Sequence, residues 1–103
     1  MSLIQTYENF SLKLRTEMVW DKELFSKLFE EMKTFCVESK DSSTIDRGVA
    51  AVFWNASWWV KQQIDGIEKF NSDYYINATT NLDHLAWTLF EKQERGGNDY
   101  EPI

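Results

Sequence analysis

The sequence predicts an all-α, up-and-down four-helix bundle that forms a single domain over residues 1–103. Three observations lead to this prediction. Apolar residues recur with a helical period of about 3.6 residues in four segments, near residues 3–18, 21–39, 44–70 and 75–95. Polar connections of about three to eight residues separate these segments, as in antiparallel bundles. The hydrophobic content of 43% and the aromatic content of 16% are sufficient for one packed core.

The first segment, residues 3–18, fits two patterns. Its apolar residues step by three or four positions, as in a helix: Leu3, Tyr7, Phe10, Leu14 and Met18. Residues 10–20 also alternate between apolar and polar, as in a strand. A strand needs neighbours for its open edges, and the chain offers only a short apolar run at residues 74–76. We therefore predict a helix.

The second segment, residues 21–39, has the features of a surface helix. Asp21 can cap its first turn, and Glu23 places negative charge near the positive end of the helix dipole. Apolar side chains share one face: Leu24, Phe25, Leu28, Phe29, Met32, Phe35 and Cys36. The polar run at residues 40–43 predicts that the helix ends near Ser39.

The third segment, residues 44–70, is the longest and the most apolar, and the bundle is expected to be built around it. Its main stripe is Ile45, Val49, Val52, Phe53, Ala56, Trp59, Val60, Ile64, Ile67 and Phe70. Ser43 or Thr44 can cap it. Gly66 weakens the helix by about 1 kcal/mol relative to Ala. Because the stripe continues beyond Gly66, we expect the helix to continue to Phe70 and to outreach its neighbours.

The fourth segment, residues 75–95, resumes the helical stripe with Ala78, Leu82, Leu85, Ala86, Leu89 and Phe90. The pair Gly96-Gly97 is expected to close this helix, since glycine favours C-terminal caps. Residues 96–103 are polar and hold the only proline, so we predict a frayed tail.

Charge and cysteine content exclude several classes of function. A net charge of −6 gives no electrostatic basis for binding a phosphate backbone, so we expect no nucleic-acid partner. Cys36 is the only cysteine, so an internal disulfide is impossible and a cytoplasmic location is the default. No export signal is expected, and no apolar run approaches the ~18 residues that span a membrane.

The sequence contains no motif that points to an enzyme, a cofactor or a metal. His84 is the only histidine and lies on the polar side of the fourth segment, so we interpret it as a surface residue. Cys36 lies on an apolar face and is interpreted as a core residue. No glycine-rich phosphate loop and no Glu-x-x-His pair is present.

The surplus of tryptophan is the main functional clue. Trp54 and Trp58 lie away from the main stripe of the third segment, and Trp87 is similarly displaced on the fourth. Three interpretations remain open: cover within the monomer, a protein interface, or a ligand groove lined by the rings. We expect a non-enzymatic interaction module of the inhibitor, antitoxin, immunity or assembly type, self-associating as a homodimer. The predicted interface is Arg47, Ala50, Ala51, Trp54, Trp58, Lys61 and Asp65. A small-molecule binder or enzyme with a pocket among the rings is the alternative.

Overall fold

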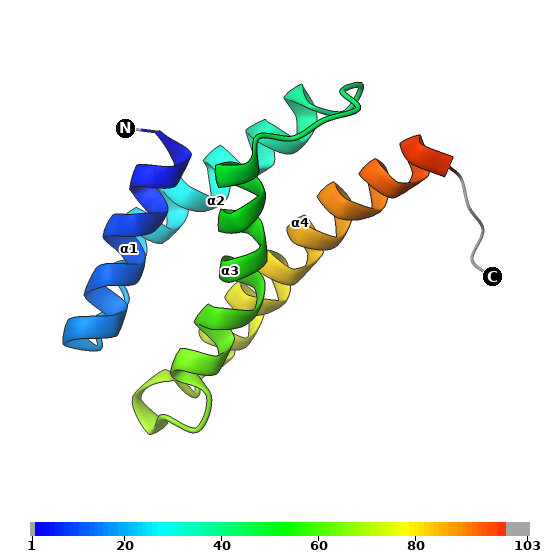
Figure 1. Ribbon diagram of the computed structural model, residues 1–103. Helices are drawn as coiled ribbons and strands as arrows, with labels where there is room; N and C mark the ends of the chain where they lie inside the picture. Colours follow the sequence, from blue (N-terminus) through cyan, green and yellow to red (C-terminus); the bar gives the residue numbers. More distant parts are fainter. Residues whose placement is uncertain (1, 99–103) are drawn as a thin grey trace.

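The computed structural model describes residues 2–98, and the side chains of residues 2–90. This part of the chain forms four α-helices and no strand: α1 (Leu3–Glu17), α2 (Lys22–Glu38), α3 (Arg47–Ile64) and α4 (Asp73–Asn98). A short 3-10 helix, η1 (Glu68–Phe70), lies between α3 and α4. Successive α-helices alternate in direction (Figure 1). The predicted all-α four-helix bundle is confirmed.

The helices form two layers. In Figure 1, α1 and α3 lie side by side in front, and α2 and α4 lie behind them. The closely packed pairs are α1 with α2, α1 with α3, α3 with α4, and α2 with α4. Helices α2 and α3 are consecutive in the chain but pack less closely, because they lie diagonally across the two layers.

Side-chain caps define the first two helices. At the start of α1, the Ser2 hydroxyl accepts a hydrogen bond from the Gln5 backbone N–H at 3.1 Å. The helix ends at Glu17, and Met18 follows in the left-handed conformation with φ 54°. Asp21 caps α2 as predicted, accepting from the Leu24 N–H at 3.0 Å. The helical interpretation of residues 3–18 is therefore confirmed.

Helix α3 is shorter than predicted at both ends. It starts at Arg47 because Asp46, not Ser43 or Thr44, is the cap, with its carboxylate 3.1 Å from the Val49 N–H. It ends at Ile64, and the predicted continuation to Phe70 is wrong. Gly66 has φ 81°, which breaks a right-handed helix. Phe70 still reaches the core, through η1.

The shorter α3 removes the predicted overhang of the central helix. With 18 residues at about 1.5 Å each, α3 is roughly 27 Å long. The longest helix is α4, which has 26 residues and starts two positions before the predicted residue 75. It continues to Asn98, so the Gly96-Gly97 pair does not end it. The rest of the predicted frayed tail, residues 99–103, lies outside the described residues.

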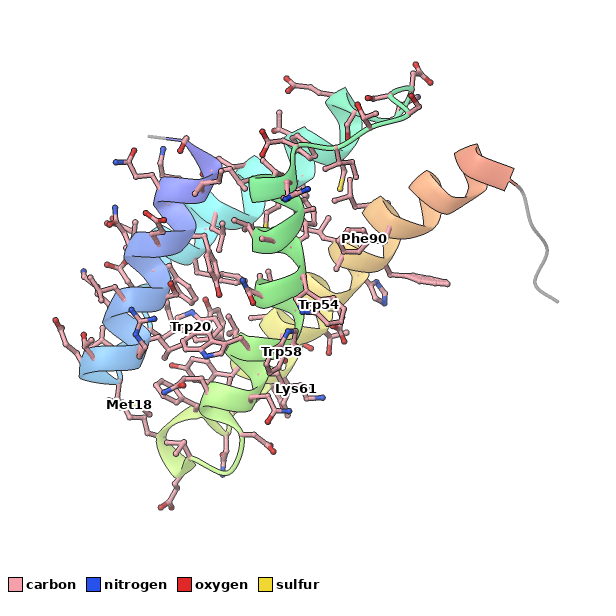
Figure 2. All side chains as sticks on the ribbon, in the orientation of Figure 1. Met18, Trp20, Trp54, Trp58, Lys61 and Phe90 are labelled. Carbon is pink, nitrogen blue, oxygen red and sulfur yellow. The ribbon has the colours of Figure 1, made fainter. Side chains whose placement is uncertain are left out.

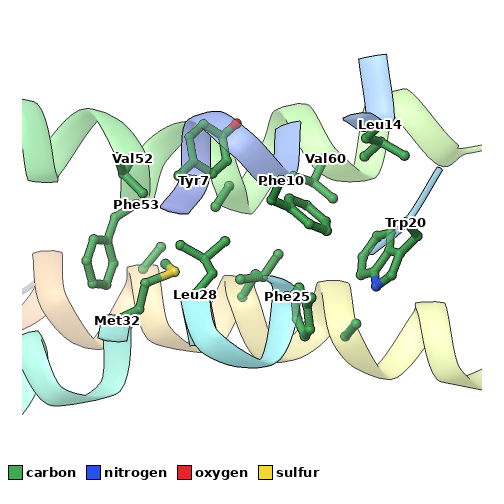
Figure 3. Packing of buried hydrophobic residues seen from close by; sticks show 14 of the residues in the cluster. Tyr7, Phe10, Leu14, Trp20, Phe25, Leu28, Met32, Val52, Phe53 and Val60 are labelled. Atoms are coloured by element: carbon green, nitrogen blue, oxygen red, sulfur yellow. The ribbon is translucent and has the colours of Figure 1, made fainter. Parts of the chain in front are cut away.

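The buried side chains form one cluster along the centre of the bundle (Figure 3). Its most buried large members are Phe10, Leu14, Leu28, Met32, Phe53, Val60 and Leu82. Cys36 is also buried, as predicted, with its thiol 3.9 Å from the Leu85 carbonyl oxygen. Phe29 and Leu85 are only partly buried and pack against the edge of the cluster.

Trp20 lies in the connection between α1 and α2, yet it is a core residue. Its side chain is 7% exposed, and its ring centroid lies 5.0 Å from Phe10 and 5.1 Å from Phe25 and Tyr75. The indole N–H donates a hydrogen bond to the Tyr74 hydroxyl at 3.1 Å. Trp20 therefore holds the α1–α2 connection against the start of α4.

Candidate functional site

The two displaced tryptophans of α3 are exposed. The side chain of Trp54 is 60% exposed and that of Trp58 is 45% exposed. They are one turn apart, and Figure 2 shows them following one another along α3, with Lys61 next in the row. The interpretation that these rings are covered within the monomer is therefore not supported.

The sequence of α3 explains this exposure. Val52, Phe53, Ala56 and Val60 are buried against the rest of the bundle. A helix buries only one broad stripe against its neighbours, so apolar residues on the opposite side stay in solvent. Trp54 and Trp58 lie on that opposite side.

Helix α4 extends the exposed aromatic surface. Trp87 is 55% exposed, and it lines an open groove of about 530 Å³ together with Trp54 of α3. The remaining lining residues are Ser57, Asp83, His84, Ala86 and Phe90. We call the rings of this surface, the exposed Trp54, Trp58, His84 and Trp87 and the half-buried Phe90, the aromatic face. It spans two helices, whereas the predicted interface was confined to α3 and Asp65.

The sequence could not place His84, Trp87 and Phe90 beside Trp54. His84 is exposed, as predicted, but it lines the groove next to the rings. The sequence clue to this surface was the displacement of Trp87 from the apolar stripe of its helix. Linking Trp87 to Trp54 also requires the relative rotation and offset of α3 and α4, and these depend on core packing.

The charged members of the predicted interface lie along α3. Arg47 is its first residue, Lys61 lies in its last turn and Asp65 follows its last residue, and all three are exposed. Among the described residues, none of the three forms an ion pair within the chain. Ala51 is exposed and Ala50 is half-buried. Charges of both signs therefore remain exposed along one helix.

Two residues of α3, Gly48 and Asn55, lie against α1 within the monomer. A Cβ atom at Gly48 would lie 3.0 Å from the Cδ1 atom of Ile4 in α1. Asn55 lines a small pocket with Tyr7 of α1. The helix that packs closely against this side of α3 is therefore α1 of the same chain.

Comparisons of the chain with protein-family models, with curated proteins and with solved structures found no match. Within residues 2–98, no helix is both long enough and apolar enough to cross a bilayer. In the same part of the chain, no three side chains of the His, Cys, Asp and Glu types are grouped so that they could hold a metal ion.

Proposed function

We propose that this chain is a non-enzymatic protein-interaction module that forms a homodimer through the aromatic face. The observation that carries the proposal is the exposure of Trp54, Trp58 and Trp87 on the adjacent helices α3 and α4. Contiguous apolar patches on soluble proteins mark interaction sites, and tryptophan is enriched among the residues that dominate binding energy. Inhibitors, antitoxins, immunity proteins and assembly subunits are small proteins that act through such faces.

The charges at the two ends of α3 favour a second copy as the occupant of the face. Arg47 and Asp65 are separated by the length of α3, roughly 27 Å. In a two-fold dimer with antiparallel α3 helices, Arg47 of one copy can meet Asp65 of the other. The tryptophans then fill the centre, and the charges form the rim.

The exposed rings are large enough to supply much of a dimer interface. If a whole tryptophan exposes up to about 250 Å², rings that are 45–60% exposed together offer roughly 400 Å². A stable interface buries about 800 Å² on each partner. The rings would thus form about half of the contact, and the surrounding residues of α3 and α4 would supply the rest.

Analytical ultracentrifugation of the wild type over a concentration series tests this proposal. We expect a dimer at micromolar concentrations and a shift to monomer in the double variant Trp54→Ala/Trp58→Ala, because each truncated hot-spot ring weakens binding by about 2 kcal/mol or more. The control is Leu12→Ala/Val37→Ala, which removes exposed apolar side chains from α1 and α2. A wild type that stays monomeric at high micromolar concentration rejects the homodimer.

A second candidate function is the binding of an apolar small molecule in the groove of the aromatic face. The observation that favours it is the position of His84 and Asp83 beside the rings, since ligand sites combine an apolar lining with a few polar groups. A monomeric wild type that binds an apolar fluorescent dye would support it. Loss of dye binding in Trp54→Ala and in Trp87→Ala, but not in Leu12→Ala, would assign the dye to this groove.

The proposal also covers where the protein acts and what kind of further partner it has. We place the protein in the cytoplasm, because its single cysteine is buried and cannot form an internal disulfide. Its acidic surface favours a basic protein over nucleic acid as any further partner. Fractionation of cells that express a tagged full-length chain tests the location.

A further inference from the structure

A second, chemically different pocket lies between α1 and α3. It has a volume of about 200 Å³. Tyr7, Ser11 and Arg15 line it from α1, at successive turns of that helix, and Asn55 and Trp59 line it from one turn of α3. The two helices run side by side in the front layer (Figure 1), and the two rows of side chains line the same pocket.

Every residue that lines this pocket carries a hydrogen-bond donor. The donors are two hydroxyls, a guanidinium, an amide and an indole N–H, and of these the Ser11 hydroxyl already donates to the Glu8 carbonyl oxygen at 3.3 Å. No carboxylate is among the lining residues. The Arg15 guanidinium carries a permanent positive charge and presents a planar fork of N–H groups that matches carboxylate and phosphate oxygens. The lining is therefore complementary to a negatively charged oxygen group.

Three of these donors have no partner within the described side chains, residues 2–90. The side chains of Arg15, Asn55 and Trp59 make no hydrogen bond or ion pair there. Asn55 and Trp59 are half-buried, which restricts their access to water. Donors that are partly withdrawn from water and lack protein partners gain most from a ligand that accepts from them.

The two hydroxyls form the inner wall of the pocket. Tyr7 is 9% exposed and Ser11 is 8% exposed. In Figure 3, the Tyr7 ring lies in the packed layer and its oxygen points away from Leu28 and Met32. Burial raises the pKa of Tyr7 to about 12, so its hydroxyl stays protonated at neutral pH and can donate. The inner wall is thus fixed in place by the core.

We propose that this pocket binds a small oxyanion, presented as a carboxylate or a phosphate group. The pocket is smaller than the ~300 Å³ at which sites for drug-sized ligands begin, so it fits an anionic head group and not a whole cofactor. Because the protein has a net charge of −6, binding depends on the local donors and not on the overall field. The site is separate from the aromatic face, since Trp58 and Trp59 project about 100° apart on α3.

The test is a titration of the full chain, followed by NMR, with inorganic phosphate in one arm and acetate in the other. Sodium chloride keeps the ionic strength constant. We expect saturable shifts of the Trp59 indole and Asn55 amide signals, with half-saturation near 1 mM, about the affinity that two or three charge-assisted hydrogen bonds supply. If the shifts saturate with only phosphate or only acetate, the pocket selects that class of anion. If they saturate with both, the pocket recognises the oxyanion group that the two share. Shifts that stay linear in both arms overturn the proposal.

Two variants with the same change in charge show whether the pocket is responsible. Arg15→Gln removes the charge from the pocket, whereas Lys40→Gln removes one from the polar connection before α3. We expect Arg15→Gln to weaken binding about tenfold or more and Lys40→Gln to leave it unchanged. Equal affinities in the wild type and in Arg15→Gln would overturn the assignment. Asn55→Ala removes a donor that lines the pocket from α3 and should also weaken binding. Neither result depends on whether the protein forms a dimer.

Discussion

At the scale of single residues, four of the five tryptophans divide by exposure into a buried and an exposed group, and Trp59 is half-buried between them. Trp20 is almost completely buried, and its N–H has a protein acceptor. Trp54, Trp58 and Trp87 are each about half exposed. Burying a tryptophan stabilises the fold, whereas exposing one has no benefit for a monomer and lowers its solubility. The exposed group is therefore the one for which a binding role is proposed.

Truncation of core and exposed rings should differ sharply in its effect on stability. Phe53 is completely buried, so Phe53→Ala should lower the free energy of unfolding by about 3–5 kcal/mol. Phe29→Ala and Leu85→Ala should cost less, because both side chains are only partly buried. Trp54→Ala should change monomer stability by less than about 1 kcal/mol. Denaturant unfolding checks all four variants, and a large loss in Trp54→Ala would place that ring in the core.

The charge of Asp21 should make stability depend on pH in the acid range. Its carboxylate accepts a hydrogen bond from the Lys13 ammonium at 2.7 Å and caps α2 through the Leu24 N–H. The hydrogen bond from Lys13, followed by that from Leu24, lowers the pKa of Asp21 below its usual 3.8. The folded state therefore binds this proton more weakly than the unfolded state. The stabilisation is fully present above pH 4, and it is lost as the pH falls through the lowered pKa.

Asp21→Asn isolates this effect, because Asn keeps a capping oxygen but has no charge. We expect the variant to be less stable than the wild type by about 0.2–1 kcal/mol at pH 7, the range for an exposed ion pair. The difference should shrink as the pH falls below 3.8 and through the lowered pKa of Asp21. Glu23→Gln serves as the control, because it removes an exposed acid from the same turn that forms no ion pair with the described side chains. A difference that is unchanged at pH 2 would contradict the assignment to charge.

At the scale of elements, backbone conformation decided where α3 ends. The apolar stripe of residues 44–70 continues through Ile67 and Phe70, and periodicity alone indicates one long helix. Gly66 instead adopts φ 81°, and the chain turns into η1. The same apolar residues then reach the core from a different element. A periodic stripe shows which residues face the core, but it does not show that one helix carries them all.

Gly66→Ala should be destabilising through the backbone alone. A Cβ atom at this position would have no heavy atom within 4 Å, so no clash is created. The left-handed conformation costs a residue with a side chain about 1–2 kcal/mol. We expect a loss of this size in denaturant unfolding, and a smaller loss in Gly66→Asn, since asparagine tolerates this region. Increased stability of Gly66→Ala would show that the helix can continue through this position.

At the scale of the whole molecule, an aromatic cluster joins the two helical hairpins. Trp20 comes from the α1–α2 connection, Phe70 from η1, and Tyr74 and Tyr75 from the first turn of α4. Their ring centroids lie within 6.4 Å of that of Trp20. The hydrogen bond between Trp20 and Tyr74 links residues 54 positions apart in the sequence. The cluster thus fixes the hairpin of α1 and α2 to that of α3 and α4 at one end of the bundle.

Disrupting this cluster should reduce the stability of the whole bundle. Trp20→Ala should lower the free energy of unfolding by about 3–5 kcal/mol, as for other buried aromatic residues. Tyr74→Phe keeps the ring and removes the acceptor of the indole N–H, at a cost of about 1–3 kcal/mol. Thermal unfolding followed by circular dichroism measures both losses. Trp87→Ala is the matched control, and a similar loss in that variant would contradict the separate roles of these tryptophans.

The sequence by itself determined the fold class, because period-3.6 apolar stripes and polar connections are local features of the chain. It also determined the cap of α2, since Asp21 acts on a backbone N–H only three residues away. It identified Trp54 and Trp58 as displaced from the core stripe, and both are exposed.

Only the tertiary structure decided which segments far apart in the chain share a surface. It placed Trp87 and His84 beside Trp54, and Asn55 and Trp59 opposite Tyr7, Ser11 and Arg15. It also showed that Trp20, in the connection between α1 and α2, is a core residue. These outcomes depend on the rotation and offset of packed helices, which are set by the fit of many side chains at once. Local periodicity carries no information about that fit.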